Sequence, residues 1–358
     1  MIYLIIFIIV LVAAEFTVRK QYIARHGIPY RCKKVAEYPY SEFIEECPAP
    51  LFWKLKPGYA VGEIHINSLG FRSPEITKNM PRIWLIGESE FFGAKLSREN
   101  DIWFRHLQQL LDKNGYKYQI INASVIGYNQ VQQKKTVLSL PLAPDDILLL
   151  RPNLNDVSIA YMQGNDWCPG NTWPLQFIHK LQRHKQWYLK LLDRSCLGML
   201  LRRNVLKKGE RKNVFTPAVG FQWEKLLEYQ EKHLLDMVQY AENTGAQVAF
   251  FSNVFSYKPE ISPQDEAGLA AIQSNWQEFV EGWSQYQFGV VDEGYRRVAD
   301  PRQLPLLRLD QHIWNHPQYP LLFLDLLHFN NEGHKVIARA LFDELLSCGL
   351  LTKPSKNS

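Results

Sequence analysis

The chain has 358 residues, of which 46% are hydrophobic and 22% are charged, and its formal net charge is +5. These proportions are those of an ordinary globular protein, so they exclude a fully disordered, collagen-like or coiled-coil chain. A charge this small does not indicate nucleic-acid binding, and we expect no nucleic-acid partner. The five cysteines lack the short paired spacings of zinc and redox motifs, so we expect no metal and no cofactor.

The amino terminus carries the one long apolar run of the sequence. No charged residue occurs from 1 to 14, and Arg19, Lys20 and Arg25 follow soon after. The run is about long enough for one bilayer crossing, so we predict a single-pass membrane anchor over residues 1–20. A cleaved signal peptide is the alternative, but it would need a basic segment before the apolar run. The side of the membrane stays open, since the basic residues favour the cytoplasm and the chemistry inferred below favours an extracytoplasmic location.

Residues 21–80 form an extension rich in Tyr and Pro, and the main domain is expected at 81–350. The alternation at 64–66, followed by Asn, Ser and Gly, predicts a strand that enters a turn. From residue 82 on, short apolar runs alternate with amphipathic segments. The pattern predicts strands at 83–86, 118–125, 147–150, 247–251 and 288–291, and helices at 101–113, 130–139, 223–243 and 332–347.

Strands that alternate with helices predict the α/β class, with a five-stranded parallel sheet covered by helices on both faces. Residues from about 158 to 222 interrupt the alternation, and we interpret them as an insertion. Within the insertion, residues 180–212 hold 11 Lys or Arg and only two acidic residues, with leucines at roughly helical spacing. This pattern is typical of a helix lying on an anionic bilayer, or of a helical insertion with a solvated basic face.

The polar residues that follow the strands are the candidates for chemistry, because ligands of such sheets bind beyond the carboxyl ends of the strands. Ser89 follows the first strand, Gly127 the second and Asn155 the third, and Asp325 and His328 precede the last helix. Taken singly, these residues are more typical of a helix cap, a turn glycine, a loop amide and a surface histidine. Only their joint occurrence favours a catalytic site.

Together these residue types suit nucleophilic catalysis. A serine at a strand-to-helix turn can present both its hydroxyl and its backbone N–H. A histidine three residues after a carboxylate can act as an oriented base, so Asp325 would hold His328 and His328 would face Ser89. The backbone N–H groups of Ser89 and Gly127 and the amide of Asn155 would form an oxyanion hole. The pattern predicts no role for His334 in this chemistry, and we interpret it as structural.

These residues resemble the four sequence blocks of the SGNH hydrolases, also called GDSL-type esterases and lipases. Residues 87–93 (GESEFFG) resemble the family's serine block, and 122–129 (NASVIGYN) resemble its glycine block. Residues 153–156 (NLND) resemble the Gly-x-Asn-Asp block, and 325–328 (DLLH) match Asp-x-x-His. The blocks occur in the family's order. The resemblance implies a flavodoxin-like three-layer α/β/α fold.

Two positions depart from the family pattern. Glu88 is one methylene longer than the usual aspartate, and Asn153 replaces a glycine, where we expect it to crowd the turn that presents Asn155. Residues 67–72 (NSLGFR) resemble a preamble of the membrane-anchored bacterial members.

The resemblance implies a serine-dependent ester hydrolase. We expect it to remove an acyl group from a cell-envelope glycan or lipid, or to transfer that group to a second hydroxyl. Because of Glu88 and Asn153, the alternative is a catalytically inactive scaffold of the same fold that binds a glycan or a partner protein.

Overall fold

The computed structural model describes residues 2–26, 43–61, 63–94, 96, 98–172, 195–201, 220–273 and 276–353. Five parallel strands form its central sheet in the order β6-β5-β7-β8-β9. The strands are β5 (Arg82–Leu85), β6 (Gln119–Asn122), β7 (Ile147–Leu150), β8 (Gln247–Phe251) and β9 (Leu306–Leu307). The chain starts at β5 and then adds strands on both sides of it, which is the flavodoxin-like order. The predicted five-stranded parallel sheet is therefore confirmed.

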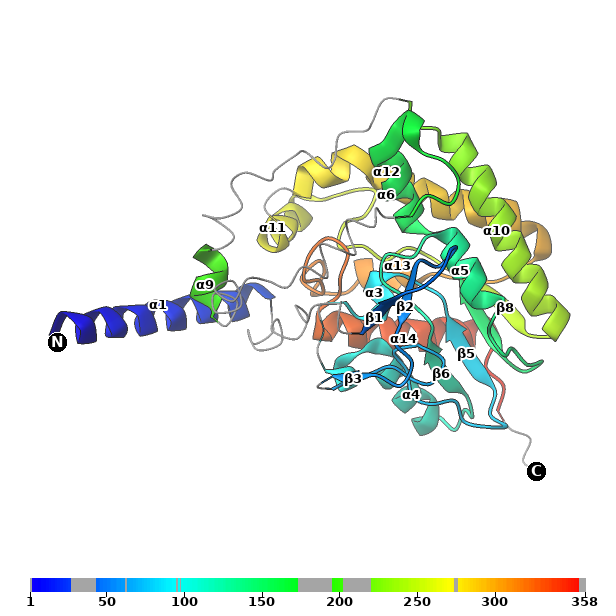
Figure 1. The fold of residues 1–358 in the computed structure, drawn as a ribbon, viewed down its shortest axis with the longest axis horizontal. Helices are drawn as coiled ribbons and strands as arrows, with labels where there is room; N and C mark the ends of the chain where they lie inside the picture. Colours follow the sequence, from blue (N-terminus) through cyan, green and yellow to red (C-terminus); the bar gives the residue numbers. More distant parts are fainter. Residues whose placement is uncertain are drawn as a thin grey trace.

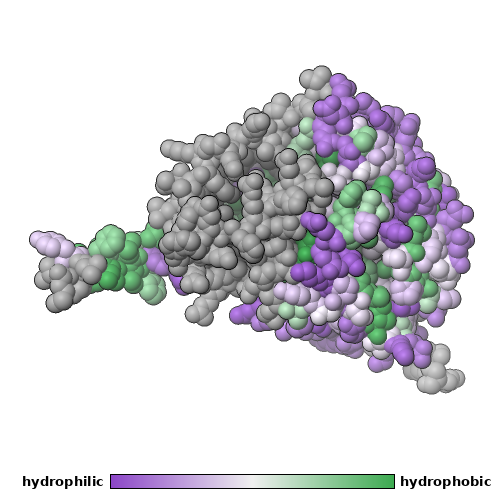
Figure 2. Space-filling view, viewed as in Figure 1, coloured by the Kyte–Doolittle hydropathy of each residue, from purple (hydrophilic) through white to green (hydrophobic). Residues whose placement is uncertain are grey.

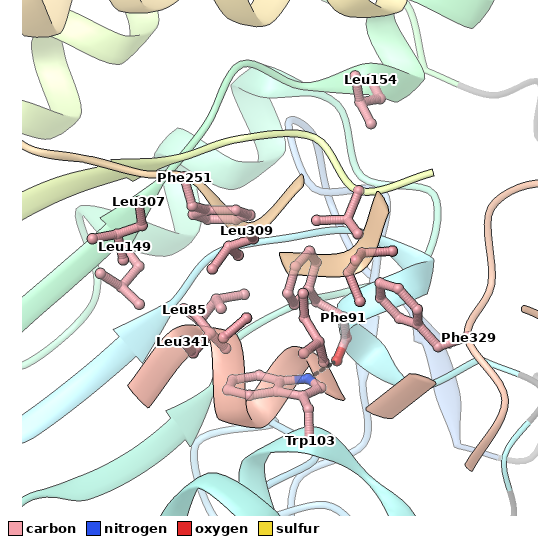
Figure 3. Packing of buried hydrophobic residues seen from close by; sticks show 14 of the residues in the cluster. Leu85, Phe91, Trp103, Leu149, Leu154, Phe251, Leu307, Leu309, Phe329 and Leu341 are labelled. Atoms are coloured by element: carbon pink, nitrogen blue, oxygen red, sulfur yellow. Dashed lines mark hydrogen bonds between the residues drawn. The ribbon is translucent and has the colours of Figure 1, made fainter. Parts of the chain in front are cut away.

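Helices cover both faces of this sheet (Figure 1). Successive strand residues point to opposite faces, so Leu85 joins one buried cluster and Trp84 joins another. The first cluster includes residues of α4 (Trp103–Lys113) and α14 (Asn331–Ser347), and the second includes residues of α5 (Gln130–Val137) and α10 (Trp223–Thr244). Figure 3 shows Leu85 of the sheet among the residues of the first cluster, with Trp103 of α4 and Leu341 of α14 nearby. The result is a three-layer sandwich.

The predicted fifth strand at 288–291 is wrong, because these residues lie within α12 (Trp276–Gly294). Val290 and Val291 are buried in the first cluster, so the run is apolar because a helix buries it. Four apolar residues are too few to distinguish a buried strand from a buried helix turn. The fifth strand is instead the two-residue β9, which pairs with β8.

Helix α1 (Ile2–His26) occupies the segment predicted as a membrane anchor, and it extends away from the rest of the chain (Figure 1). Its projecting part presents apolar surface (Figure 2). Phe7 and Val10 are among its exposed side chains. Among the residues that the structure describes, no helix combines the length and the apolar character needed to span a bilayer. The prediction of a membrane-spanning anchor is therefore not supported.

The extension before the sheet forms two antiparallel hairpins, β1 (Ile44–Glu46) with β2 (Trp53–Leu55) and β3 (Ala60–Val61) with β4 (Ile64–His65). The strand predicted at 64–66 corresponds to β4. A third apolar cluster joins the extension to the loops that follow β5 and β6. It contains Phe43, Ile44, Trp53, Leu55, Ile64, Ile66, Phe92, Ala94, Val125, Ile126 and Tyr128. The extension thus packs against the end of the sheet where the candidate residues lie.

Other short elements connect these parts of the fold. They are α3 (Ser89–Phe92), α6 (Leu154–Gln163), α9 (Cys196–Leu201), α11 (Pro263–Ile272), α13 (Leu309–Trp314), and 3-10 turns at Glu99–Asp101, Gly164–Asp166 and Asp300–Arg302, with a π turn at Tyr295–Ala299. Of the basic segment at 180–212, only residues 195–201 are described, so its predicted surface role lies mostly outside the described residues.

Candidate active site

Three loops that carry predicted site residues leave neighbouring strands at one edge of the sheet. Leu85 at the end of β5 pairs with Asn122 of β6 and with Leu149 of β7, and all three strands are parallel. Ser89 follows β5, Gly127 follows β6 and Asn155 follows β7. Because β5 lies between the other two, this edge is the point where the strand order reverses. Ligands bind at such points in open α/β sheets.

Ser89 is placed to present its hydroxyl. It is the first residue of α3, and the cap position belongs to Glu88, which makes no side-chain cap bond. From Ile83 to Ala94, Ser89 is the only residue that is not buried. A Cβ on Gly87 would lie 2.9 Å from Cβ of Phe91 and 3.0 Å from Oγ of Ser124, so glycine suits this tightly packed turn. Because Glu88 holds the cap position, the simpler interpretation of Ser89 as a helix cap is wrong.

His328 and Asp325 lie on a short loop closed by the bridge between Phe323 and Phe329. Nε2 of His328 lies 2.9 Å from Oγ of Ser89, across 239 residues of sequence. Nδ1 of His328 lies 2.9 Å and 3.0 Å from the two carboxylate oxygens of Asp325. When Nδ1 donates to this carboxylate, Nε2 carries the lone pair and can accept the Ser89 proton. The predicted meeting of hydroxyl, imidazole and carboxylate is thus present in the geometry.

Two backbone N–H groups, those of Ser89 and Gly127, are the predicted main-chain donors of the oxyanion hole. Gly127 is buried and has φ +75°, a conformation that favours glycine. Within the described part of the chain, neither the N–H of Gly127 nor that of Ser89 has a protein acceptor. Buried N–H groups without an acceptor are rare in folded proteins, so the Gly127 donor is suited to a ligand.

Asn155 supplies a third donor. It is the only residue from Arg151 to Tyr161 that is not buried. Its Nδ2 donates to the carbonyl oxygen of Tyr128 at 3.0 Å. An amide nitrogen carries two hydrogens, so one N–H of Asn155 stays available for a ligand.

Asn153 does not crowd the turn as expected. Its φ is −78°, an ordinary extended value, and its Oδ1 accepts the N–H of Asp156 at 3.0 Å as the cap of α6. Its Nδ2 donates to the same Tyr128 carbonyl oxygen at 2.9 Å. Asn153 therefore ties the loop after β7 to the loop after β6, next to Asn155.

The sequence pattern did not predict Arg151. This residue follows β7 and links it to the segment around Ser89. Its guanidinium is fully buried, pairs with Glu88 and Glu90, and lies 5.4 Å from the ring centres of Phe91 and Phe251. Burial lowers the pKa of Arg151, and the charge of Glu88 opposes that effect. A charged residue directly after the apolar run 147–150 is the signal that could have identified it.

Both carboxylate oxygens of Glu88 contact the segment that follows β7. One carboxylate oxygen pairs with Arg151, and the other accepts the backbone N–H of Leu154 at 3.1 Å. Glu88 therefore connects the residue before Ser89 to the residue before Asn155.

Two further buried ionisable groups have structural partners. Burial raises the pKa of Asp156 to about 8, and its Oδ2 accepts the N–H of Gln130 at 2.7 Å, at the start of α5. Burial lowers the pKa of His334 well below its usual value, and its Nδ1 accepts the N–H of Trp103 at 3.3 Å. His334 is thus structural, as the sequence predicts. No group of three or more potential metal ligands occurs among the described residues.

No protein-family model matches the chain, and no curated protein matches it. Similar solved structures include a GDSL-like lipase from Bacteroides thetaiotaomicron, an acetyl xylan esterase, and a lipase/acylhydrolase from Enterococcus faecalis. The first is 12% identical with a TM-score of 0.39, covering 77% of this chain and 92% of the lipase. The xylan esterase is 13% identical with a TM-score of 0.39, covering 73% and 98%. The Enterococcus protein is 12% identical with a TM-score of 0.41, covering 77% and 100%.

Proposed function

We propose that this chain is a serine-dependent ester hydrolase of the SGNH type. The observation that supports the proposal is the chain of hydrogen bonds from Ser89 through His328 to Asp325, at the edge of the sheet where ligands bind. Among the described residues the N–H of Gly127 has no acceptor, and Tyr128 takes only one of the two amide hydrogens of Asn155, which adds to this support. The substrate class stays the prediction from the sequence, an acylated glycan or lipid of the cell envelope.

In the proposed reaction, His328 Nε2 takes the hydroxyl proton as Oγ of Ser89 bonds to the ester carbonyl carbon. The carbonyl oxygen becomes an oxyanion, which the N–H groups of Ser89 and Gly127 and the amide of Asn155 stabilise. The bond to the leaving oxygen then breaks, and His328 returns the proton to that oxygen. Water, activated by the same histidine, attacks the acyl-serine and releases the acid. A second hydroxyl in place of water would make the reaction an acyl transfer.

The test is hydrolysis of p-nitrophenyl acetate and butyrate by the full chain and by Ser89→Ala. We expect the variant to lose at least about a thousandfold in kcat/KM, since its proposed nucleophile is gone. Ser139→Ala is the matched control, because that hydroxyl donates to the carbonyl oxygen of Thr136 near the end of α5 and contacts no predicted site residue. Full activity of Ser89→Ala would overturn the proposal.

A fluorophosphonate probe separates the hydrolase from the inactive scaffold of the same fold. The hydrolase should be labelled at Ser89 at neutral pH, and Ser89→Ala should not. An absence of labelling in the unmodified chain would favour the scaffold. The contacts of Glu88 and Asn153, which join the site loops, favour the hydrolase.

A further inference from the structure

The extension before the sheet reaches one peptide of the site directly. Nε1 of Trp53, in β2, donates to the carbonyl oxygen of Ile126 at 3.1 Å. This oxygen belongs to the same peptide group as the N–H of Gly127. The indole is 2% exposed, so water does not compete freely for the bond.

The geometry of a peptide group connects this bond to the proposed oxyanion hole. A peptide is planar and trans, so its carbonyl and its N–H point in opposite directions. A donor that holds the Ile126 oxygen on one side therefore sets the direction of the Gly127 N–H on the other. A carbonyl that accepts a hydrogen bond also polarises its peptide, which makes the N–H a stronger donor.

Trp53 also holds the residue on the far side of Gly127. The hydroxyl of Tyr128 donates to the carbonyl oxygen of Trp53 at 2.7 Å, and the two rings meet edge to face at 5.6 Å. The carbonyl oxygen of Tyr128 in turn accepts from Asn155. Gly127 is thus flanked by two residues bound to Trp53, and one of them also contacts the third proposed donor.

We propose that Trp53 is a positioning residue of the oxyanion hole, acting through the Ile126–Gly127 peptide. The inference rests on the proposed function, and it assigns to the extension a role in the reaction. Glycine at 127 leaves this peptide free to rotate unless another group holds it. The indole N–H provides that restraint from a segment 73 residues earlier in the chain.

The test is Trp53→Phe, which keeps an aromatic ring in the third apolar cluster and removes the N–H donor. We expect kcat on p-nitrophenyl butyrate, per site titrated with fluorophosphonate, to fall about tenfold. This is less than the 10²–10³-fold loss typical when an oxyanion donor is itself removed. KM should change little, because the effect arises where the oxyanion forms. The pH profile should also stay the same, because His328 is untouched.

Trp84→Phe is the matched control. Its indole is also buried, and it donates to Asp146, just before the amino end of β7. This variant should lower thermal stability without changing kcat per titrated site. A purely structural role for Trp53 would give the same result in Trp53→Phe, and that result would overturn the inference.

A second measurement does not depend on turnover. In protein labelled with ¹⁵N-glycine, the Gly127 amide signal, assigned by its loss in Gly127→Ala, should shift in Trp53→Phe and stay in place in Trp84→Phe. An unchanged signal in Trp53→Phe would overturn the inference. Failure of the unmodified chain to hydrolyse any activated ester would overturn the proposed function, and the amide comparison would still decide whether Trp53 controls the Gly127 peptide.

Discussion

One carboxylate oxygen of Asp325 receives both the backbone N–H and the ring Nδ1 of His328, each at 2.9 Å. The same oxygen also accepts the N–H of Leu327 at 2.9 Å. The carboxylate therefore holds the backbone of its loop and the imidazole ring at once. This arrangement favours the tautomer with hydrogen on Nδ1, which leaves Nε2 to accept a proton from Ser89.

Asp325→Asn should keep the loop folded and impair the base. An amide can still accept the backbone N–H groups, but its NH₂ can donate to Nδ1 and favour the other tautomer. We expect kcat/KM on p-nitrophenyl butyrate to fall about 10³–10⁴-fold. Asp343→Asn is the control, because Asp343 pairs with exposed Arg339 on the surface of α14. A loss below tenfold in Asp325→Asn would contradict an orienting role.

Asn155→Ala should remove one oxyanion donor. Since such donors act mainly where charge develops, we expect kcat to fall about 10²–10³-fold with a smaller change in KM. Steady-state kinetics on the same ester measures both. Asn114→Ala serves for comparison, since the Asn114 amide donates to a carbonyl at the exposed end of α4. Equal kinetics in the two variants would exclude Asn155 from the hole.

Arg151→Met should destabilise the fold strongly. The substitution leaves the carboxylates of Glu88 and Glu90 buried without their cation. Breaking a buried pair in this way typically costs about 3–5 kcal/mol of the free energy of unfolding, which urea titration would report. Arg339→Met, which breaks the exposed pair with Asp343, should cost about 0–1 kcal/mol. A similar small cost for both variants would show that the buried pair contributes little.

Asp156 should make stability depend on pH. Its pKa is about 8 in the fold and about 3.9 in an unfolded chain, so between these values the folded form binds more protons. The contribution of Asp156 is therefore full below about pH 4 and is lost as the pH rises to 8, by up to about 1.4 kcal/mol per pH unit. Asp156→Asn removes this term. Urea unfolding at pH 5, 6, 7 and 8 should show the free energy of unfolding of the variant rising relative to that of the unmodified chain as the pH rises. A difference between the two that does not change with pH would contradict the prediction.

The sequence alone determined the α/β class and the candidate residues. Parallel strands bring their carboxyl ends to one edge, so polar residues after successive apolar runs could be assigned to one site before any contact was known. This holds for Ser89, Gly127 and Asn155, whose places depend on local strand ends.

Only the tertiary structure decided which groups support them. The run at 288–291 became a helix because burial, not strand pairing, explains its apolar character. Arg151 reaches Glu88 across 63 residues, and Trp53 reaches Ile126 across 73. Such contacts leave no periodic signal in the sequence, because they depend on how distant loops are packed against each other rather than on the local conformation of either one.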